Sequence, residues 1–183
     1  IATAATHAAI AGNPMFGVLA ADLVRRQAMA PGERFMLGDG LQAELFMVPG
    51  KLPLYLEGDD PDTASESAAN VGVELTSGNA RLVYVPGAAA ITPALRERFL
   101  RADAILFDGT LFTDDEMIRT GTGAKTGRRM GHMPIEGPHG SLAALDGDTR
   151  EGYIGTYNPP ALVDNDPTSV VWEVGASYQE PDA

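Results

Sequence analysis

The sequence predicts a layered α/β fold in a single domain over residues 1–183. One observation is a strand, helix, strand unit, in which apolar runs at residues 81–85 and 104–107 flank a helix that starts at Thr92-Pro93. The other is a series of short apolar runs separated by glycine and proline, at residues 34–37, 41–48, 52–56 and 71–76. A chain of this length can bury roughly 70% of its unfolded surface, which is enough for a core between a sheet and its helices.

Two helices are predicted from the same signal, a capping residue followed by proline. Asn13-Pro14 predicts a helix over residues 14–27, and Thr92-Pro93 predicts a shorter one before the apolar run at residues 104–107. The apolar residues that recur at helical spacing are Met15, Val18, Leu19, Leu23 and Val24 in the first helix, and Leu95, Phe99 and Leu100 in the second.

Three segments are predicted to be turns or loops. Residues 57–69 are acidic and rich in small side chains, so they offer no apolar face and predict an exposed loop. Residues 77–79 predict a hairpin turn. Residues 110–140 are dense in glycine and predict a long loop, of the kind that often carries function. A brief helix at residues 142–145 and strands near residues 153–154 and at 170–174 complete the expected elements.

Charge and composition exclude several classes of protein. With 13 Lys and Arg against 25 Asp and Glu, the net charge is −12, which disfavours a surface that binds nucleic-acid phosphates. No apolar run reaches the ~20 residues that span a bilayer, so a cytoplasmic protein without a membrane segment is expected. The chain has no cysteine, so a metal would need His, Asp, Glu or Asn ligands. Because it begins at Ile1 without an initiator Met, we expect a fragment entered partway through a fold unit.

Asp108 and His132 are the candidate catalytic residues. Asp108 directly follows the apolar run at residues 104–107, and carboxyl ends of strands face the ligand crevice in layered α/β folds. The alternative is that Asp108 only caps its turn. His132 lies in a glycine-rich loop and can act as a ligand or a proton-transfer group, or can be merely structural. His7 and His139 carry less weight, because the three histidines show no zinc-binding spacing.

Lys125, Arg128 and Arg129 form the one basic cluster of an acidic chain. Cations gathered in a glycine-rich loop suit a substrate that carries carboxylates, which arginine can hold through paired hydrogen bonds. The alternative is a solvated charge run that pairs with the acidic residues 114–116.

Five motifs, taken together and in order, are more specific than any one of them. They are Phe46-Met47-Val48-Pro49-Gly50-Lys51-Leu52-Pro53-Leu54-Tyr55-Leu56-Glu57, Val83-Tyr84-Val85-Pro86-Gly87, Leu106-Phe107-Asp108-Gly109-Thr110, Asp114-Asp115-Glu116-Met117-Ile118-Arg119 and Lys125-Thr126-Gly127-Arg128-Arg129-Met130-Gly131-His132. Over residues 13–145 the chain resembles the pyrroloquinoline quinone biosynthesis protein B family.

The resemblance implies a partial metallo-β-lactamase-like αββα sandwich and a role in making the redox cofactor pyrroloquinoline quinone. Family members are regarded either as iron-dependent hydroxylases of a tyrosine-containing precursor peptide or as carriers of the cofactor or its precursor. The implied partners are that cofactor or precursor and other cofactor-biosynthesis proteins. Carried over by position, Asp108 and His132 line the active-site side, and Lys125, Arg128 and Arg129 match the basic loop that binds substrate.

The departures from the family pattern concern its metal sites. The family's N-terminal third, with a cysteine-rich zinc site and an Asp-His metal motif, has no counterpart, and Ala88 stands where the family usually has Cys. Near the end, a family segment beginning with His is reduced to Gly155-Thr156-Tyr157-Asn158-Pro159, which leaves Asn158 as a candidate substrate-binding residue. Iron or zinc is therefore expected in the complete protein, with Asp108 and His132 the candidate ligands here. An uncovered sheet face would also favour association, including a homo-oligomer.

Overall fold

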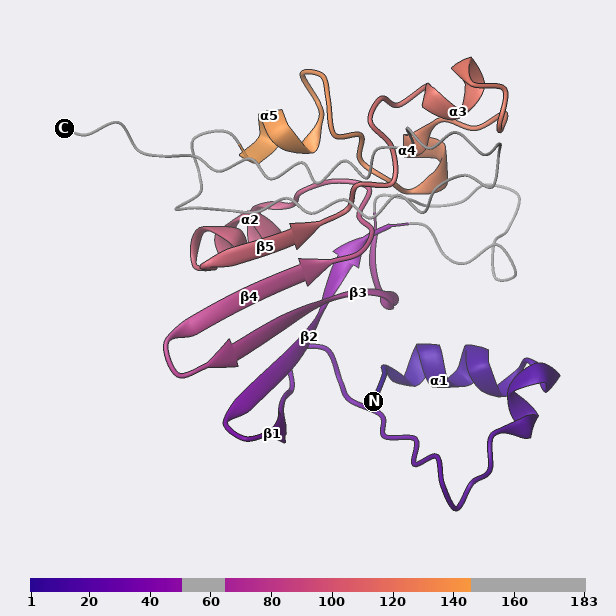
Figure 1. Cartoon of the computed structure of the whole chain (residues 1–183), viewed down its shortest axis with the longest axis vertical. Coiled ribbons are helices and arrows are strands. Elements are labelled where there is room, and N and C mark those ends of the chain that lie inside the picture. Colours follow the sequence, from indigo (N-terminus) through magenta and orange to yellow (C-terminus); the bar gives the residue numbers. More distant parts are fainter. Residues whose placement is uncertain (51–64, 146–183) are drawn as a thin grey trace, which may run out of the picture.

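One five-stranded sheet forms the centre of the computed structural model, which describes residues 1–50 and 65–145 (Figure 1). The strand order is β1-β2-β3-β4-β5, antiparallel through β4 and parallel between β4 and β5. The strands are β1 (Arg34–Gly38), β2 (Leu41–Pro49), β3 (Glu66–Ser77), β4 (Ala80–Val85) and β5 (Ala104–Phe107). The parallel pair confirms the predicted strand, helix, strand unit, because such a connection needs a crossover.

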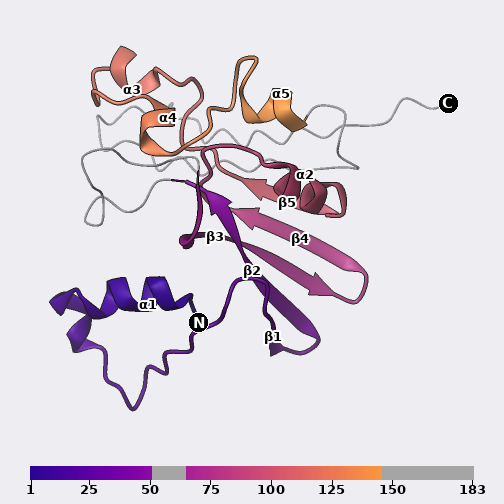
Figure 2. The same cartoon turned by 180° about the vertical axis from the view of Figure 1, so that it is seen from behind.

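The helices lie at two ends of the molecule (Figures 1 and 2). They are α1 (Ala4–Ala11), the 3₁₀ helix η1 (Pro14–Val18), α2 (Pro93–Leu100), α3 (Glu116–Arg119), α4 (Gly127–Met130) and α5 (Ser141–Leu145). In both views α2 to α5 gather near β5, whereas α1 lies at the opposite end, beyond β2. Within the described ranges no helix has the length and apolar character to cross a bilayer.

The face of the sheet beneath α2 carries the hydrophobic core. Val83 and Val85 of β4 are fully buried, and they alternate with outward-facing neighbours as a strand requires. Phe99 of α2 meets Phe107 of β5 edge to face, with ring centroids 5.7 Å apart. Leu95, one helical turn before Phe99, is buried as well. This packing fixes the strand that ends at residue 107 against its helix.

The opposite face of the sheet is also apolar but is only partly covered. Leu45, Val73, Tyr84 and Leu106 are successive register partners across β2 to β5, so their side chains form one row on that face. Leu45 is buried, whereas Tyr84 is 44% and Leu106 37% exposed. The row is therefore an apolar surface that the described elements leave partly open to solvent.

The prediction of a helix over residues 14–27 is wrong. Asn13 does act as the cap, since its Oδ1 accepts the Met15 N–H at 3.0 Å, but only the 3₁₀ helix to Val18 follows. Met15, Val18 and Leu23 are exposed, so no burial offsets the cost of ordering a longer helix. The α1 helix was not predicted, although Thr3 caps it and alanine, the strongest helix former, fills most of it.

Other predicted elements are confirmed or only adjusted. The hairpin turn at residues 77–79 is present, with Gly78 at φ +57°. The predicted loop over residues 57–69 is wrong at its end, because β3 begins at Glu66. Beyond a bulge after Met47, Ser67 pairs with Val48 and Glu66 pairs with Pro49. The glycine-rich segment 110–140 contains two short helices, α3 and α4. The predicted strands at residues 52–56, 153–154 and 170–174 lie outside the described residues.

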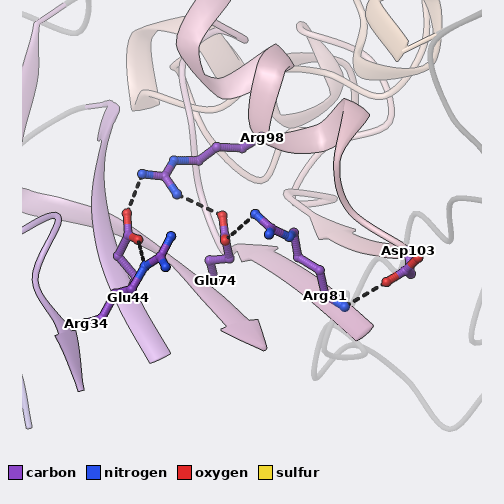
Figure 3. Close-up of polar contacts among 6 residues, drawn as sticks. All are labelled: Arg34, Glu44, Glu74, Arg81, Arg98 and Asp103. Carbon is purple, nitrogen blue, oxygen red and sulfur yellow. Dashed lines mark hydrogen bonds and ion pairs between the residues drawn. The ribbon is translucent and has the colours of Figure 1, made fainter. Parts of the chain in front are cut away.

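A network of charged side chains joins α2 to the sheet (Figure 3). Glu44 of β2 and Glu74 of β3 are directly opposite each other on the face beneath α2, and both are buried. Arg98 of α2 bridges them, donating from Nη2 to Glu44 at 2.5 Å and from Nη1 to Glu74 at 2.8 Å. Arg34 and Arg81 take the remaining carboxylate oxygens. Two buried like charges are thus held together by cations.

The same network extends to the start of β5. The backbone N–H of Arg81 donates to Asp103 Oδ2 at 2.7 Å, and the backbone N–H of Asp103 donates to the Arg81 carbonyl. The Arg98 guanidinium also lies over the Phe46 ring, 4.5 Å from its centroid. Helix α2 and the beginning of β5 are therefore tied to the middle of the sheet, which determines where β5 ends.

The balance of burial and charge sets the pKa of Glu44. Burial favours the neutral acid and raises the pKa, but the hydrogen bonds and charges of Arg98 and Arg34 outweigh it and hold the pKa below its ordinary value of 4.5. Burial also lowers the pKa of Arg98. The hydrogen bonds and charges of Glu44 and Glu74 have the larger effect, so the pKa of Arg98 is raised overall. Both groups are charged throughout the neutral range.

Arg98→Ala should destabilise the fold by about 3 kcal/mol, because it leaves two buried carboxylates opposed with one partner fewer each. Urea unfolding followed by circular dichroism measures the change. Arg101→Ala is the matched control, since Arg101 is exposed at the end of the same helix and should change stability by less than about 0.5 kcal/mol. Equal losses in the two variants would contradict a role for the bridge.

The stability of the protein should also fall below about pH 4.5 in a way that depends on Glu44. A carboxyl whose pKa is lower in the folded state contributes stability above its unfolded pKa, and that contribution disappears as the pH falls through the folded pKa. Glu44→Gln should flatten this part of the curve of unfolding free energy against pH. Glu97→Gln, on the exposed side of α2, should leave the slope as it is.

Candidate functional site

Asp108 lies immediately after β5 with its side chain fully buried. Oδ1 accepts the backbone N–H of Thr110 at 3.1 Å and the Thr110 hydroxyl at 2.7 Å. Oδ2 accepts the backbone N–H of Ala88 at 3.2 Å. The predicted turn-capping role is therefore present, and Asp108 also reaches the segment that follows β4.

His132 is brought to Asp108 by the end of helix α4. Thr126 caps that helix, and Gly131 ends it in the left-handed conformation at φ +82°, which glycine adopts without strain. The backbone N–H of His132 then donates to the Gly127 carbonyl at 2.9 Å. The next residue, Met133, donates its N–H to the Ala88 carbonyl at 2.9 Å. Ala88 therefore bonds both segments: its carbonyl accepts from Met133, and its N–H donates to Asp108.

The two candidate catalytic side chains are in direct contact. His132 Nδ1 lies 2.8 Å from Asp108 Oδ2, and the imidazole is 30% exposed whereas the carboxylate is fully buried. Each oxygen of Asp108 now has two partners, so Asp108 holds the imidazole in place. Within the described part of the chain Nε2 of His132 has no recorded partner. It is the atom of this pair that is free to bind a ligand or move a proton.

Sequence reasoning named both members of the pair but missed Thr110 and Ala88. Thr110 had a local signal, since an Asp side chain commonly accepts the N–H two residues later. Ala88 had none, because its bond to Asp108 joins the ends of two strands and depends on the sheet.

The basic cluster lies on and just before α4, a few residues from His132. Lys125, Arg128 and Arg129 are exposed. The neighbouring acids do not pair with these three side chains. Asp114 accepts the backbone N–H of Arg128, and Asp115 forms an ion pair with Arg119. Within residues 1–50 and 65–145 no ion pair is recorded for the three basic side chains, so they stand available to an anionic ligand. Asn158, the remaining candidate, lies outside the described residues.

The described residues do not by themselves make a metal centre. Catalytic zinc sites use three protein ligands and structural sites four. Among the residues that the structure describes, no cluster of three or more His, Cys, Asp or Glu side chains is placed to hold an ion. Of the two candidate ligands, only Nε2 of His132 lacks a hydrogen-bond partner among the described residues, because both oxygens of Asp108 already accept two hydrogen bonds each.

Comparison with known proteins identifies the family. Residues 1–149 match the model of the beta-lactamase superfamily domain. The chain belongs to the beta-lactamase superfamily. This result confirms the predicted fold class, a layered sheet with helices of the metallo-β-lactamase type.

The relatives also confirm the resemblance drawn from the motifs. The chain is similar to proteins named coenzyme PQQ synthesis protein B from Rhizobium meliloti, at 46% identity over 99% of this chain, and from Ruegeria pomeroyi, at 46% over 96%. It spans 57% of the length of each. A crystal structure of Zn(2+)-bound PqqB from Methylobacterium extorquens is similar with a TM-score of 0.77 and 45% identity, covering 81% of this chain and 50% of that one.

Replacing the Thr110 hydroxyl should weaken the anchoring of Asp108. Thr110→Val keeps the branched shape and the backbone N–H but removes a donor to a buried carboxylate, so a loss of about 1.5 kcal/mol is expected. Thr110→Ser keeps the hydroxyl and should lose less than about 0.5 kcal/mol. Thermal unfolding of the two variants measures the difference, and equal stability would show that the hydroxyl contributes nothing.

Proposed function

We propose that this chain is part of a cytoplasmic protein that takes part in making coenzyme PQQ. The support is the similarity over nearly the whole chain to relatives that carry that name. The residues that support the proposal are Asp108 and His132, because their contact joins a buried carboxylate to a part-exposed imidazole.

The activity we propose is hydroxylation of a tyrosine-derived peptide precursor by a metal-dependent enzyme. Hydroxylation by oxygen needs a redox-active metal, so iron would supply the chemistry of this step, whereas zinc has no redox chemistry and could act only as a Lewis acid. In this proposal, Asp108 and His132 position a proton-transfer group at the substrate. Nε2 of His132 can accept or donate a proton at the substrate, while the Asp108 carboxylate keeps the ring in position and stabilises its charged form. Of the two candidate metal ligands, Asp108 and His132, the imidazole would hold the metal through Nε2, because the oxygens of Asp108 are already hydrogen-bonded.

A second function, a carrier of the cofactor or its precursor, is favoured by the basic cluster. Arg128 and Arg129 lie on one short helix, exposed and without recorded ion pairs in the described residues. Such side chains can bind the carboxylates of a quinone through charge-assisted hydrogen bonds without any bond-making step. Lys125 precedes them and adds a third positive charge. The same loop could bind substrate for an enzyme, so the two proposals differ in whether His132 is needed.

His132→Ala in the complete protein should reduce precursor hydroxylation by a factor on the order of 10² or more, the usual contribution of a proton-transfer group. His139→Ala is the matched control, because His139 is exposed in the same segment and has no recorded contact there. Oxygen consumption, product mass and bound metal are measured together. Loss of turnover with metal retained supports proton transfer, and loss of both supports ligation.

The carrier proposal predicts a different result in the same set of proteins. Binding of the cofactor should survive His132→Ala and a chelator, and the double variant Arg128→Ala, Arg129→Ala should lose about 100-fold in affinity. Arg25→Ala with Arg101→Ala controls for the loss of two charges. No hydroxylation by the wild type, together with chelator-resistant binding, would exclude the enzyme and favour the carrier.

A further inference from the structure

We infer that Gly87 is a positioning residue, which together with Asp108 holds the His132 imidazole as the Nδ1–H tautomer with Nε2 directed away from the protein core. The inference rests on the proposed role of His132, and it concerns how the ring is held rather than which reaction follows. Its basis is the space beside Gly87 that the edge of the His132 ring occupies, where a larger residue would carry its Cβ atom.

The hydrogen bonds around Asp108 determine the tautomer. Backbone amides can only donate, and each oxygen of Asp108 accepts one, from Thr110 at Oδ1 and from Ala88 at Oδ2. A carboxylate surrounded by donors acts as the acceptor toward its remaining neighbour. His132 Nδ1, 2.8 Å from Oδ2, must therefore carry the hydrogen. In the neutral ring Nε2 is then the unprotonated nitrogen.

Gly87 makes room for the ring at this place. A Cβ atom built on Gly87 would lie 3.3 Å from His132 Cε1, 3.6 Å from Nδ1 and 4.0 Å from Asp108 Oδ2. The backbone of Gly87 is not in the left-handed region, so its φ does not require glycine. The contact with the imidazole is what a larger residue would disturb. The glycine thus sets how closely the ring can approach Asp108.

The imidazole, and not the fold, should give way when this space is filled. The ring is 30% exposed, and a Cβ atom at residue 87 would require it to shift by only a few tenths of an ångström. Gly87→Ala should therefore leave the protein folded while it lengthens the bond from Nδ1 to Asp108. A residue that merely supported the fold would change stability and leave the tautomer alone.

The test is ¹⁵N nuclear magnetic resonance of the 183-residue chain labelled at histidine. The chain has three histidines, and His132→Gln identifies the signals of His132. At a pH where the ring is neutral, the wild type should show a protonated Nδ1 and an unprotonated Nε2. Gly87→Ala should mix the tautomers and speed exchange of the Nδ1 hydrogen with water about tenfold, as expected for the loss of one charge-assisted bond.

Gly17→Ala is the matched control, because a Cβ there would meet no atom within 4 Å. It should leave both nitrogen signals and the exchange rate of His132 unchanged. A wild type with the hydrogen on Nε2 would overturn the inference, and this arm holds even if Gly87→Ala fails to fold. A folded Gly87→Ala variant with unchanged His132 signals would overturn it as well. Neither readout depends on the coenzyme, so the proposed function can fail separately.

Discussion

The buried carboxylate of Asp108 joins three parts of the chain that are distant in sequence. It ends β5, accepts hydrogen bonds from the turn after β4 and from Thr110, and holds His132 from the glycine-rich loop. A buried carboxylate is stable only when its oxygens have partners. That requirement makes the arrangement specific, because the loop over residues 110–135 must return to the sheet edge to supply the last donor. The hydrogen bonds to one buried carboxylate therefore hold the site together.

The position of that carboxylate depends in turn on the charged network under α2. Arg98 separates two buried glutamates that would otherwise repel each other across neighbouring strands, and Arg81 ties the same network to the start of β5. Core packing alone would allow α2 to slide over an apolar sheet face. Directed hydrogen bonds from one guanidinium to two strands restrict it to one register. The charged network therefore holds the start of β5, and the hydrogen bonds of Asp108 hold the chain just after its end.

Most of the sheet could be predicted from sequence because it depends on local signals. Alternating apolar residues, glycine turns and the Thr92-Pro93 cap gave β1, β2, β4, β5 and α2 with small errors at their ends. The helix over residues 14–27 could not be judged locally, since its length depends on whether a surface exists to bury Leu23 and its neighbours. The ends of β3 depended on pairing with β2 across a bulge. Asp108 and His132 were predicted as candidates from strand end and loop chemistry, but their contact at 2.8 Å is a property of the tertiary structure.

The most direct test of this account is a crystal structure of the protein grown with zinc or iron and with coenzyme PQQ. The account predicts that His132 keeps Nδ1 on Asp108 and that Nε2 lies at about 2.0–3.2 Å from the metal or from a polar atom of the bound molecule, within coordination or hydrogen-bond distance. An imidazole turned away from the bound groups, or an Asp108 that no longer contacts His132, would contradict it.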